Sequence, residues 1–82
     1  MAKFVFLGRL QDVAGVPELN MPLDRSTALA AVLDRMPPDL IRALADSKIR
    51  VAVNGELVAG SSAELMIADG DEIAFLPPVS GG

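Results

Sequence analysis

The 82-residue sequence contains no cysteine, histidine, tryptophan or tyrosine. The lack of cysteine excludes disulfides, thiolate metal sites and thiol nucleophiles. The lack of histidine excludes Ser-His-Asp and Cys-His nucleophile activation, imidazole metal ligands and the usual general base at neutral pH. Carboxylates, lysine, arginine, serine and threonine remain. A self-contained enzyme is difficult to build from these in one small domain, so we expect catalytic groups to come from partner proteins.

The sequence also lacks a long apolar run and a basic surface. Its longest unbroken apolar run covers residues 28–33, far short of the roughly 20 residues that a membrane span needs. The first residues show no signal-peptide pattern, so we expect a cytoplasmic protein with no membrane attachment. All Lys and Arg residues lie within positions 1–50, whereas positions 51–82 contain acids and no base. Phosphate binding needs a basic patch, so nucleic acid is not an expected partner.

Alternating apolar residues predict five strands within a single domain of residues 1–82. The strands cover residues 3–7, 18–23, 48–53, 56–58 and 72–76. Asn54-Gly55 predicts a type I′ hairpin turn, and Asp69-Gly70-Asp71 predicts a second tight turn. Residues 8–15 are expected to be a polar connection. Residues 59–68 are expected to be irregular, with Leu65 and Ile67 reaching the core.

A change of period after the second strand predicts the main helix. Ser26 is its expected N-cap and Thr27 its first residue. Apolar residues then recur at i, i+3, i+4 and i+7 and form one stripe, made of Leu29, Val32, Leu33 and Met36. Pro37-Pro38 ends this helix, because proline lacks the amide donor. Asp39 is the expected cap of a short second helix over residues 40–45.

The element order β-β-α-β-β-β predicts an α+β fold in which one main helix packs across one face of a mixed five-stranded sheet. The first and last strands are the most hydrophobic, so we place them side by side at the centre. This is the β-grasp, or ubiquitin-like, arrangement. Four residues are expected to face the helix: Phe4, Phe6, Ile73 and Phe75. Their neighbours Val5, Leu7, Ala74 and Leu76, joined by Leu57, then form an apolar patch on the open face. We interpret that patch as a docking surface for a partner; the alternative is that loops cover it.

The sequence ends in Pro77-Pro78-Val79-Ser80-Gly81-Gly82, and we expect residues 77–82 to form a flexible tail. Prolines at its base block further strand pairing and direct the chain off the sheet. Glycine has no Cβ, so the tip can enter a narrow channel and present an unhindered carboxylate. The acid-rich second half is either a solvated face or a surface that steers the tail to a basic groove. A frayed terminus is the plainer interpretation of the ending.

The last fourteen residues closely resemble the C-terminal signature of the MoaD family, the small subunits of molybdopterin synthase. These fourteen residues are Asp69-Gly70-Asp71-Glu72-Ile73-Ala74 followed by Phe75-Leu76-Pro77-Pro78-Val79-Ser80-Gly81-Gly82. Val51-Ala52-Val53-Asn54 is similar to the family's third-strand signature, and length and element order agree over essentially the whole chain. Arg9-Leu10-Gln11-Asp12 departs from the family pattern, which more often has an Arg-Glu pair there.

The resemblance implies a sulfur carrier that binds no cofactor itself. A MoeB-like enzyme would use ATP to adenylate the Gly82 carboxylate, which is then converted to a thiocarboxylate. The tail, with Gly81 allowing it to thread, would enter a MoaE-like large subunit and donate sulfur to cyclic pyranopterin monophosphate, forming the dithiolene of molybdopterin. Two small and two large subunits would form a heterotetramer. The implied partner-binding residues are Leu7, Leu57, Leu76, Pro77, Pro78, Val79 and Ser80.

Three other functions stay open. A ThiS-like sulfur carrier for thiazole synthesis shares the Gly-Gly ending, although such proteins are typically shorter and lack the Pro-Pro before the tail. A ubiquitin-like protein modifier would instead be joined through Gly82 to lysines of target proteins. The third is a β-grasp interaction domain with an inert tail.

Overall fold

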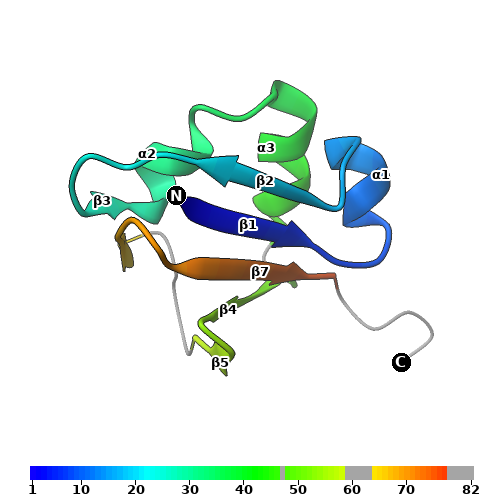
Figure 1. Ribbon diagram of the computed structural model, residues 1–82. Coiled ribbons are helices and arrows are strands. Elements are labelled where there is room, and N and C mark those ends of the chain that lie inside the picture. The colour runs from blue at the N-terminus through cyan, green and yellow to red at the C-terminus, as the bar shows by residue number, and fades with distance from the viewer. Residues whose placement is uncertain (47, 59–63, 78–82) are drawn as a thin grey trace.

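The structure is a computed structural model that describes residues 1–46, 48–58 and 64–77. Five strands form a mixed sheet in the order β2-β1-β7-β4-β5. Their bounds are Glu18–Met21 (β2), Ala2–Phe6 (β1), Glu72–Leu76 (β7), Arg50–Val53 (β4) and Glu56–Leu57 (β5). The central strands β1 and β7 pair in parallel, and the other neighbours pair antiparallel. The helices lie on one side of the sheet, and the β4–β5 hairpin forms the edge of the sheet opposite β2 (Figure 1). The predicted α+β, β-grasp fold with its mixed five-stranded sheet is confirmed.

The core lies between the sheet and the helices. Phe4, Phe6, Ile73 and Phe75 are at most 1% exposed, which confirms the predicted inward face of the two central strands. The ring of Phe75 stacks on both other phenylalanines, with centroids 5.7 Å from Phe6 and 6.4 Å from Phe4. The helical layer contributes Leu29, Val32 and Leu40, each fully buried in the same cluster.

The first predicted helix is shorter and begins later than expected. Helix α2 covers Leu29–Leu33, and Thr27–Ala28 is instead a short strand, β3, paired with β6 (Met66–Ile67). Ser26 is not the N-cap: that position is Ala28, and no side chain caps the helix. The backbone N–H of Leu29 donates to the carbonyl of Leu65 at 2.8 Å. Pairing with a distant segment thus satisfies a donor that a capping side chain would otherwise bind.

The prolines do not end the first helix, because α2 already stops at Leu33 with Asp34 as its C-cap. Pro38 instead starts helix α3, which covers Pro38–Leu44. Its fixed φ and missing N–H suit the first turn, where the amide has no partner within the helix. The predicted cap at Asp39 is wrong, because Asp39 lies inside the helix and its carboxylate accepts a hydrogen bond from Arg42.

The expected polar connection at residues 8–15 contains a further helix, α1 (Leu10–Ala14). Leu10 is 3% exposed and belongs to the core. Gly15 ends the helix at φ 80, a left-handed conformation that glycine adopts without a Cβ penalty. Burial of Leu10 stabilises this helix, which is too short to be stable alone. The described residues therefore contain three helices where the sequence predicts two, and of the two predicted helices only the first is shorter than expected.

Three strands are shorter than predicted, and one of them, β5, ends at Leu57 instead of at residue 58. Strand β2 ends at Met21 because Pro22 cannot donate to the ladder, yet Leu23 is still buried. Strand β4 begins at Arg50. Asn54 and Gly55 have φ values of 51 and 88, the positive values that the predicted type I′ turn requires.

The segment expected to be irregular contains the short strand β6. Ile67 is fully buried and Leu65 packs against the core, as predicted for both. Residues 59–63, which fall within the same prediction, lie outside the described residues.

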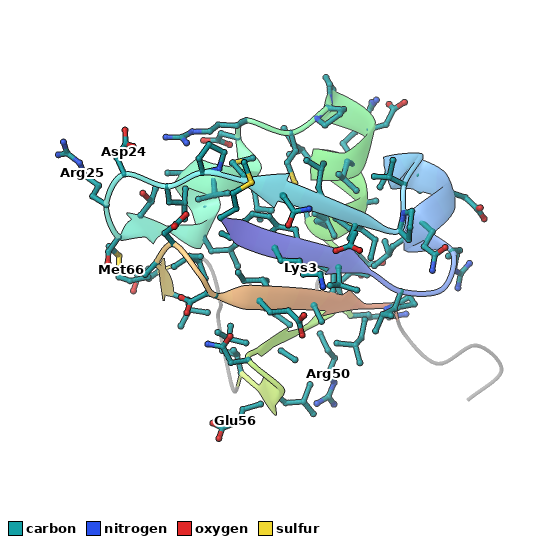
Figure 2. All side chains as sticks on the ribbon, in the orientation of Figure 1. Lys3, Asp24, Arg25, Arg50, Glu56 and Met66 are labelled. Carbon is teal, nitrogen blue, oxygen red and sulfur yellow. The ribbon has the colours of Figure 1, made fainter. Side chains whose placement is uncertain are left out.

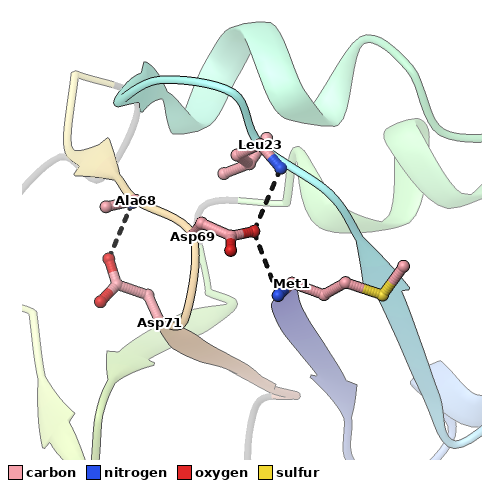
Figure 3. Close-up of polar contacts among 5 residues, drawn as sticks. All are labelled: Met1, Leu23, Ala68, Asp69 and Asp71. Carbon is pink, nitrogen blue, oxygen red and sulfur yellow. Dashed lines mark hydrogen bonds and ion pairs between the residues drawn. The ribbon is translucent and has the colours of Figure 1, made fainter.

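The Asp69-Gly70-Asp71 turn ties both central strands to their surroundings (Figure 3). The Asp69 carboxylate lies 3.1 Å from the Met1 ammonium and accepts the N–H of Leu23 at 3.2 Å. These two contacts hold the pKa of Asp69 below its usual value. The N–H of Ala68 donates to Asp71 at 2.8 Å, and this bond, with that from the Asn54 amide, lowers the pKa of Asp71.

Candidate functional site: the open sheet face and the base of the tail

A row of small and apolar side chains crosses the open face of the sheet. Strand register places Val5 opposite Ala74, Ala74 opposite Ala52, and Ala52 opposite Leu57. Val5, Ala52 and Ala74 are half-buried, and Leu57 is 59% exposed at the edge. Ala52 was not among the predicted residues, although its alternation with Val51 and Val53 assigns it to this face.

A second pair lies beside this row, nearer the base of the tail. Leu7 is 38% exposed, and its N–H donates to the carbonyl of Phe75 at 3.1 Å, which continues the β1–β7 pairing past the end of β1. Leu76 is half-buried on β7 and lies opposite Arg50 of β4. We name the six residues of this surface the docking face: Val5, Leu7, Ala52, Leu57, Ala74 and Leu76. A continuous apolar surface of this kind is typical of a protein interaction site.

A charged group borders the docking face on the side away from the tail. The Lys3 Nζ lies 3.3 Å from the Glu18 carboxylate and 3.7 Å from that of Glu72. The hydrogen bond to Glu18 is the main cause that raises the pKa of Lys3, and the charges of both acids add to it. Figure 2 labels Lys3, which lies on β1, and Arg50, a separate charged residue of β4 that lies opposite Leu76. Sequence patterns alone do not reveal the group formed by Lys3, Glu18 and Glu72, because recognising it requires the strand register.

The structure brings together some of the predicted site residues. Leu7, Leu76 and Pro77 lie where the two central strands end, and Leu57 lies two strands away from Leu76, connected to it through Ala52 and Ala74. Five predicted residues fall outside the described part of the chain: Pro78, Val79, Ser80, Gly81 and Gly82. Their roles stay predictions.

The helical side of the tail base contains a pocket of about 300 Å³ between α1 and α3. Its apolar lining is Leu10, Val13, Ala43, Ile49 and Pro77, and its charged lining is Arg9, Arg42 and Asp46. Pro77 therefore has the docking face on one side and this pocket on the other.

Within residues 1–46, 48–58 and 64–77, no cluster of three or more acidic side chains is placed to bind a metal ion. Over the same ranges, no helix has the length and apolar character that crossing a membrane requires. The described arrangement consists of an apolar surface, a charged border, and Pro77 at the base of the tail.

Comparison with known proteins adds three findings. Residues 4–82 match the ThiS family. The molybdopterin synthase sulfur carrier subunit of Escherichia coli (strain K12) is 35% identical over 88 aligned residues, which cover 100% of each chain. SAMP1 of Haloferax volcanii, a small archaeal modifier protein, is similar in structure with a TM-score of 0.77 and 31% identity, covering 99% of this chain and 98% of that one.

A more distant structure shares the fold. It is a complex of subunits 1 and 2 of molybdopterin-converting factor from Helicobacter pylori 26695, in which a chain is 23% identical with a TM-score of 0.65. The match covers 99% of this chain and 97% of that one.

Proposed function

The chain belongs to the ThiS family and, within it, to the molybdopterin synthase sulfur carrier subunits, and from that membership we propose that its Gly82 carboxylate is the group that carries the sulfur. The observation that carries this proposal is the similarity to a carrier subunit over the full length of both chains. The Gly-Gly ending agrees with it, because glycine presents the least hindered acyl carbon.

The proposed cycle has three steps. In an activating enzyme, the Gly82 carboxylate attacks the α-phosphate of ATP, which forms an acyl adenylate and releases pyrophosphate. A sulfur nucleophile supplied by that system then displaces AMP, leaving a thiocarboxylate. In the synthase, the thiocarboxylate sulfur bonds to a carbon of cyclic pyranopterin monophosphate, and water then hydrolyses the resulting thioester, which leaves the sulfur on the pyranopterin and returns Gly82 to a carboxylate. The chain has no thiol or imidazole of its own that would attack the adenylate.

The proposed partner of the docking face is the large synthase subunit, which would receive the tail in its active site. Leu7 and Leu76 would contact the large subunit beside Pro77, and Leu57 would extend this contact to the edge of the sheet. The Helicobacter complex supports a paired subunit for this fold, and the dithiolene needs two sulfurs, which agrees with two carriers per heterotetramer. We further propose that the protein acts in the cytoplasm.

A second candidate function, protein modification, is favoured by the 31% identity to a small archaeal modifier protein. In that case the activated Gly82 would form an isopeptide bond with a lysine of a target protein. A thiazole-synthesis carrier is the third candidate, and it would load sulfur in the same way but deliver it to a different acceptor.

Intact-mass spectrometry separates the first two functions. The purified chain is incubated with a MoeB-like enzyme, ATP and a sulfur source, and a chain lacking Gly82 is treated in parallel. A sulfur carrier gains the mass of one sulfur-for-oxygen exchange, in the full chain only and only with ATP. Lysine conjugates without that gain would show a modifier. Adding cyclic pyranopterin monophosphate and the large subunit then tests the acceptor.

A further inference from the structure

Pro77, at the base of the tail, packs against Gly8 in the turn between β1 and α1. A Cβ placed on Gly8 would lie 3.0 Å from Pro77 Cγ and 3.8 Å from Pro77 Cδ. The 3.0 Å distance is shorter than most contacts that a Cβ atom makes in proteins. The Pro77 ring can therefore pack in this position because residue 8 has no side chain. Gly8 also has φ +57, in the left-handed region.

The turn against which the Pro77 ring packs is held on both sides. Ahead of it, the N–H of Leu7 donates to the carbonyl of Phe75 at 3.1 Å. Behind it, the N–H of Gln11 donates to the carbonyl of Gly8 at 3.2 Å, at the start of α1. Because the Gly8 backbone is fixed, a side chain added there would displace the Pro77 ring rather than the turn.

We infer that Gly8 is a positioning residue for the tail: its missing side chain sets the direction in which the chain leaves the sheet at Pro77. This inference rests on the proposed function only in one respect, namely that a partner receives the tail along that direction for sulfur transfer. Five residues follow Pro77 and can reach at most about 18 Å, so the direction in which the chain leaves Pro77 decides which region of a partner lies within reach of Gly82. Leu7 and Leu76 directly precede the two residues in contact, so the same contact connects the docking face to the tail.

The test compares Gly8→Ala with Gly15→Ala. Gly15 has φ +80, but a Cβ there would meet nothing within 4 Å, so this control adds backbone strain without touching Pro77. Since the chain has no cysteine, spin labels on Ala31→Cys, which is exposed on α2, and Ser80→Cys report the tail direction as a distance distribution. We expect Gly8→Ala to shift this distribution and Gly15→Ala to leave it as in the parent. An unshifted Gly8→Ala, or an equal shift in both variants, would overturn the inference.

Pro77→Ala provides a second variant that leaves the turn intact. Removing the ring should shift the same distance, and Gly8→Ala combined with Pro77→Ala should add no further shift, because the clashing Cγ is gone. A further shift in the double variant, as large as that of Gly8→Ala alone, would show that the effect does not pass through the ring.

Sulfur transfer by the unlabelled thiocarboxylated chain to the pyranopterin, with the large subunit present, is the second readout. Gly8→Ala should lower the rate about tenfold or more relative to Gly15→Ala, since a 1 Å misplacement of a reacting group costs about a hundredfold. If the parent chain transfers no sulfur, the proposed function fails, while the distance measurement still decides the role of Gly8. If the parent transfers sulfur and Gly8→Ala keeps both the parent rate and the parent distances, the role of Gly8 fails alone.

Discussion

The ring of Phe75 stacks on the ring of Phe6, with centroids 5.7 Å apart and planes inclined by 11°. Phe75 is 1% exposed, and its neighbours along the chain, Ala74 and Leu76, belong to the docking face. Strand β7 therefore carries the core on one side and the docking surface on the other, as the two-residue period of a strand permits. Substitutions at adjacent positions should consequently separate stability from binding.

Replacing Phe75 with alanine should lower the free energy of unfolding by about 3–5 kcal/mol, because a fully buried aromatic ring is lost and a cavity is left. Urea denaturation measures the change. Leu76→Ala, on the opposite side of the same strand, should cost less because that side chain is only half-buried. A loss below about 1 kcal/mol for Phe75→Ala would show that the ring is not a core residue.

An aspartate in place of Leu57 should weaken binding to the large subunit about 30-fold, equivalent to about 2 kcal/mol, by placing a charge in an apolar contact. Met66 provides a matched control: it is 57% exposed, close to the 59% of Leu57, but lies on β6 outside the docking face. Isothermal titration calorimetry should show Met66→Asp binding like the parent. Equal losses for both variants would mean that added negative charge, rather than the docking face, controls the affinity.

Acid should destabilise the protein through Asp69 and Asp71. Both pKa values lie below the usual 3.8 in the folded chain, so the unfolded chain binds protons first as the pH falls. The stability that these carboxylates contribute is complete above 3.8 and is lost as the pH falls through the lower, folded values. Asp69→Asn with Asp71→Asn should therefore lose less stability than the parent between about pH 5 and pH 2.

Urea midpoints measured across that pH range provide the readout. Asp34→Asn is the control, because Asp34 is exposed and has no side-chain hydrogen bond or ion pair within the described ranges. In the Asp34→Asn control, the urea midpoint should fall with decreasing pH as steeply as in the parent chain. If the midpoint of the double variant fell as steeply as well, the turn would not be a source of the acid sensitivity.

The strands and their faces were predictable because a period of two needs only a local pattern. Phe4, Phe6, Ile73 and Phe75 could be assigned to the core without knowing their partners, and the hydrophobicity of β1 and β7 placed them at the centre. The docking face follows from the same alternation. Ala52 was missed because a small side chain does not stand out in composition.

The helix boundaries and the polar contacts depend on distant parts of the chain, so local patterns did not predict them. Helix α2 begins at Leu29 because the carbonyl of Leu65 accepts its N–H, and α1 forms because Leu10 reaches the core. The ion pairs of Lys3 with Glu18 and Glu72 can be recognised only when the register between three strands is known. The contact of Gly8 with Pro77 joins opposite ends of the chain, and only the folded structure shows it.

Molybdopterin formation by the thiocarboxylated chain and the large subunit, supplied with cyclic pyranopterin monophosphate, shows whether Gly82 carries the sulfur. The full chain is compared with a chain that ends at Gly81, which has passed through the same loading reaction. We expect product from the full chain and none from the shortened one, with equal unfolding midpoints for the two chains. Equal product from both chains would contradict the claim that Gly82 carries the sulfur.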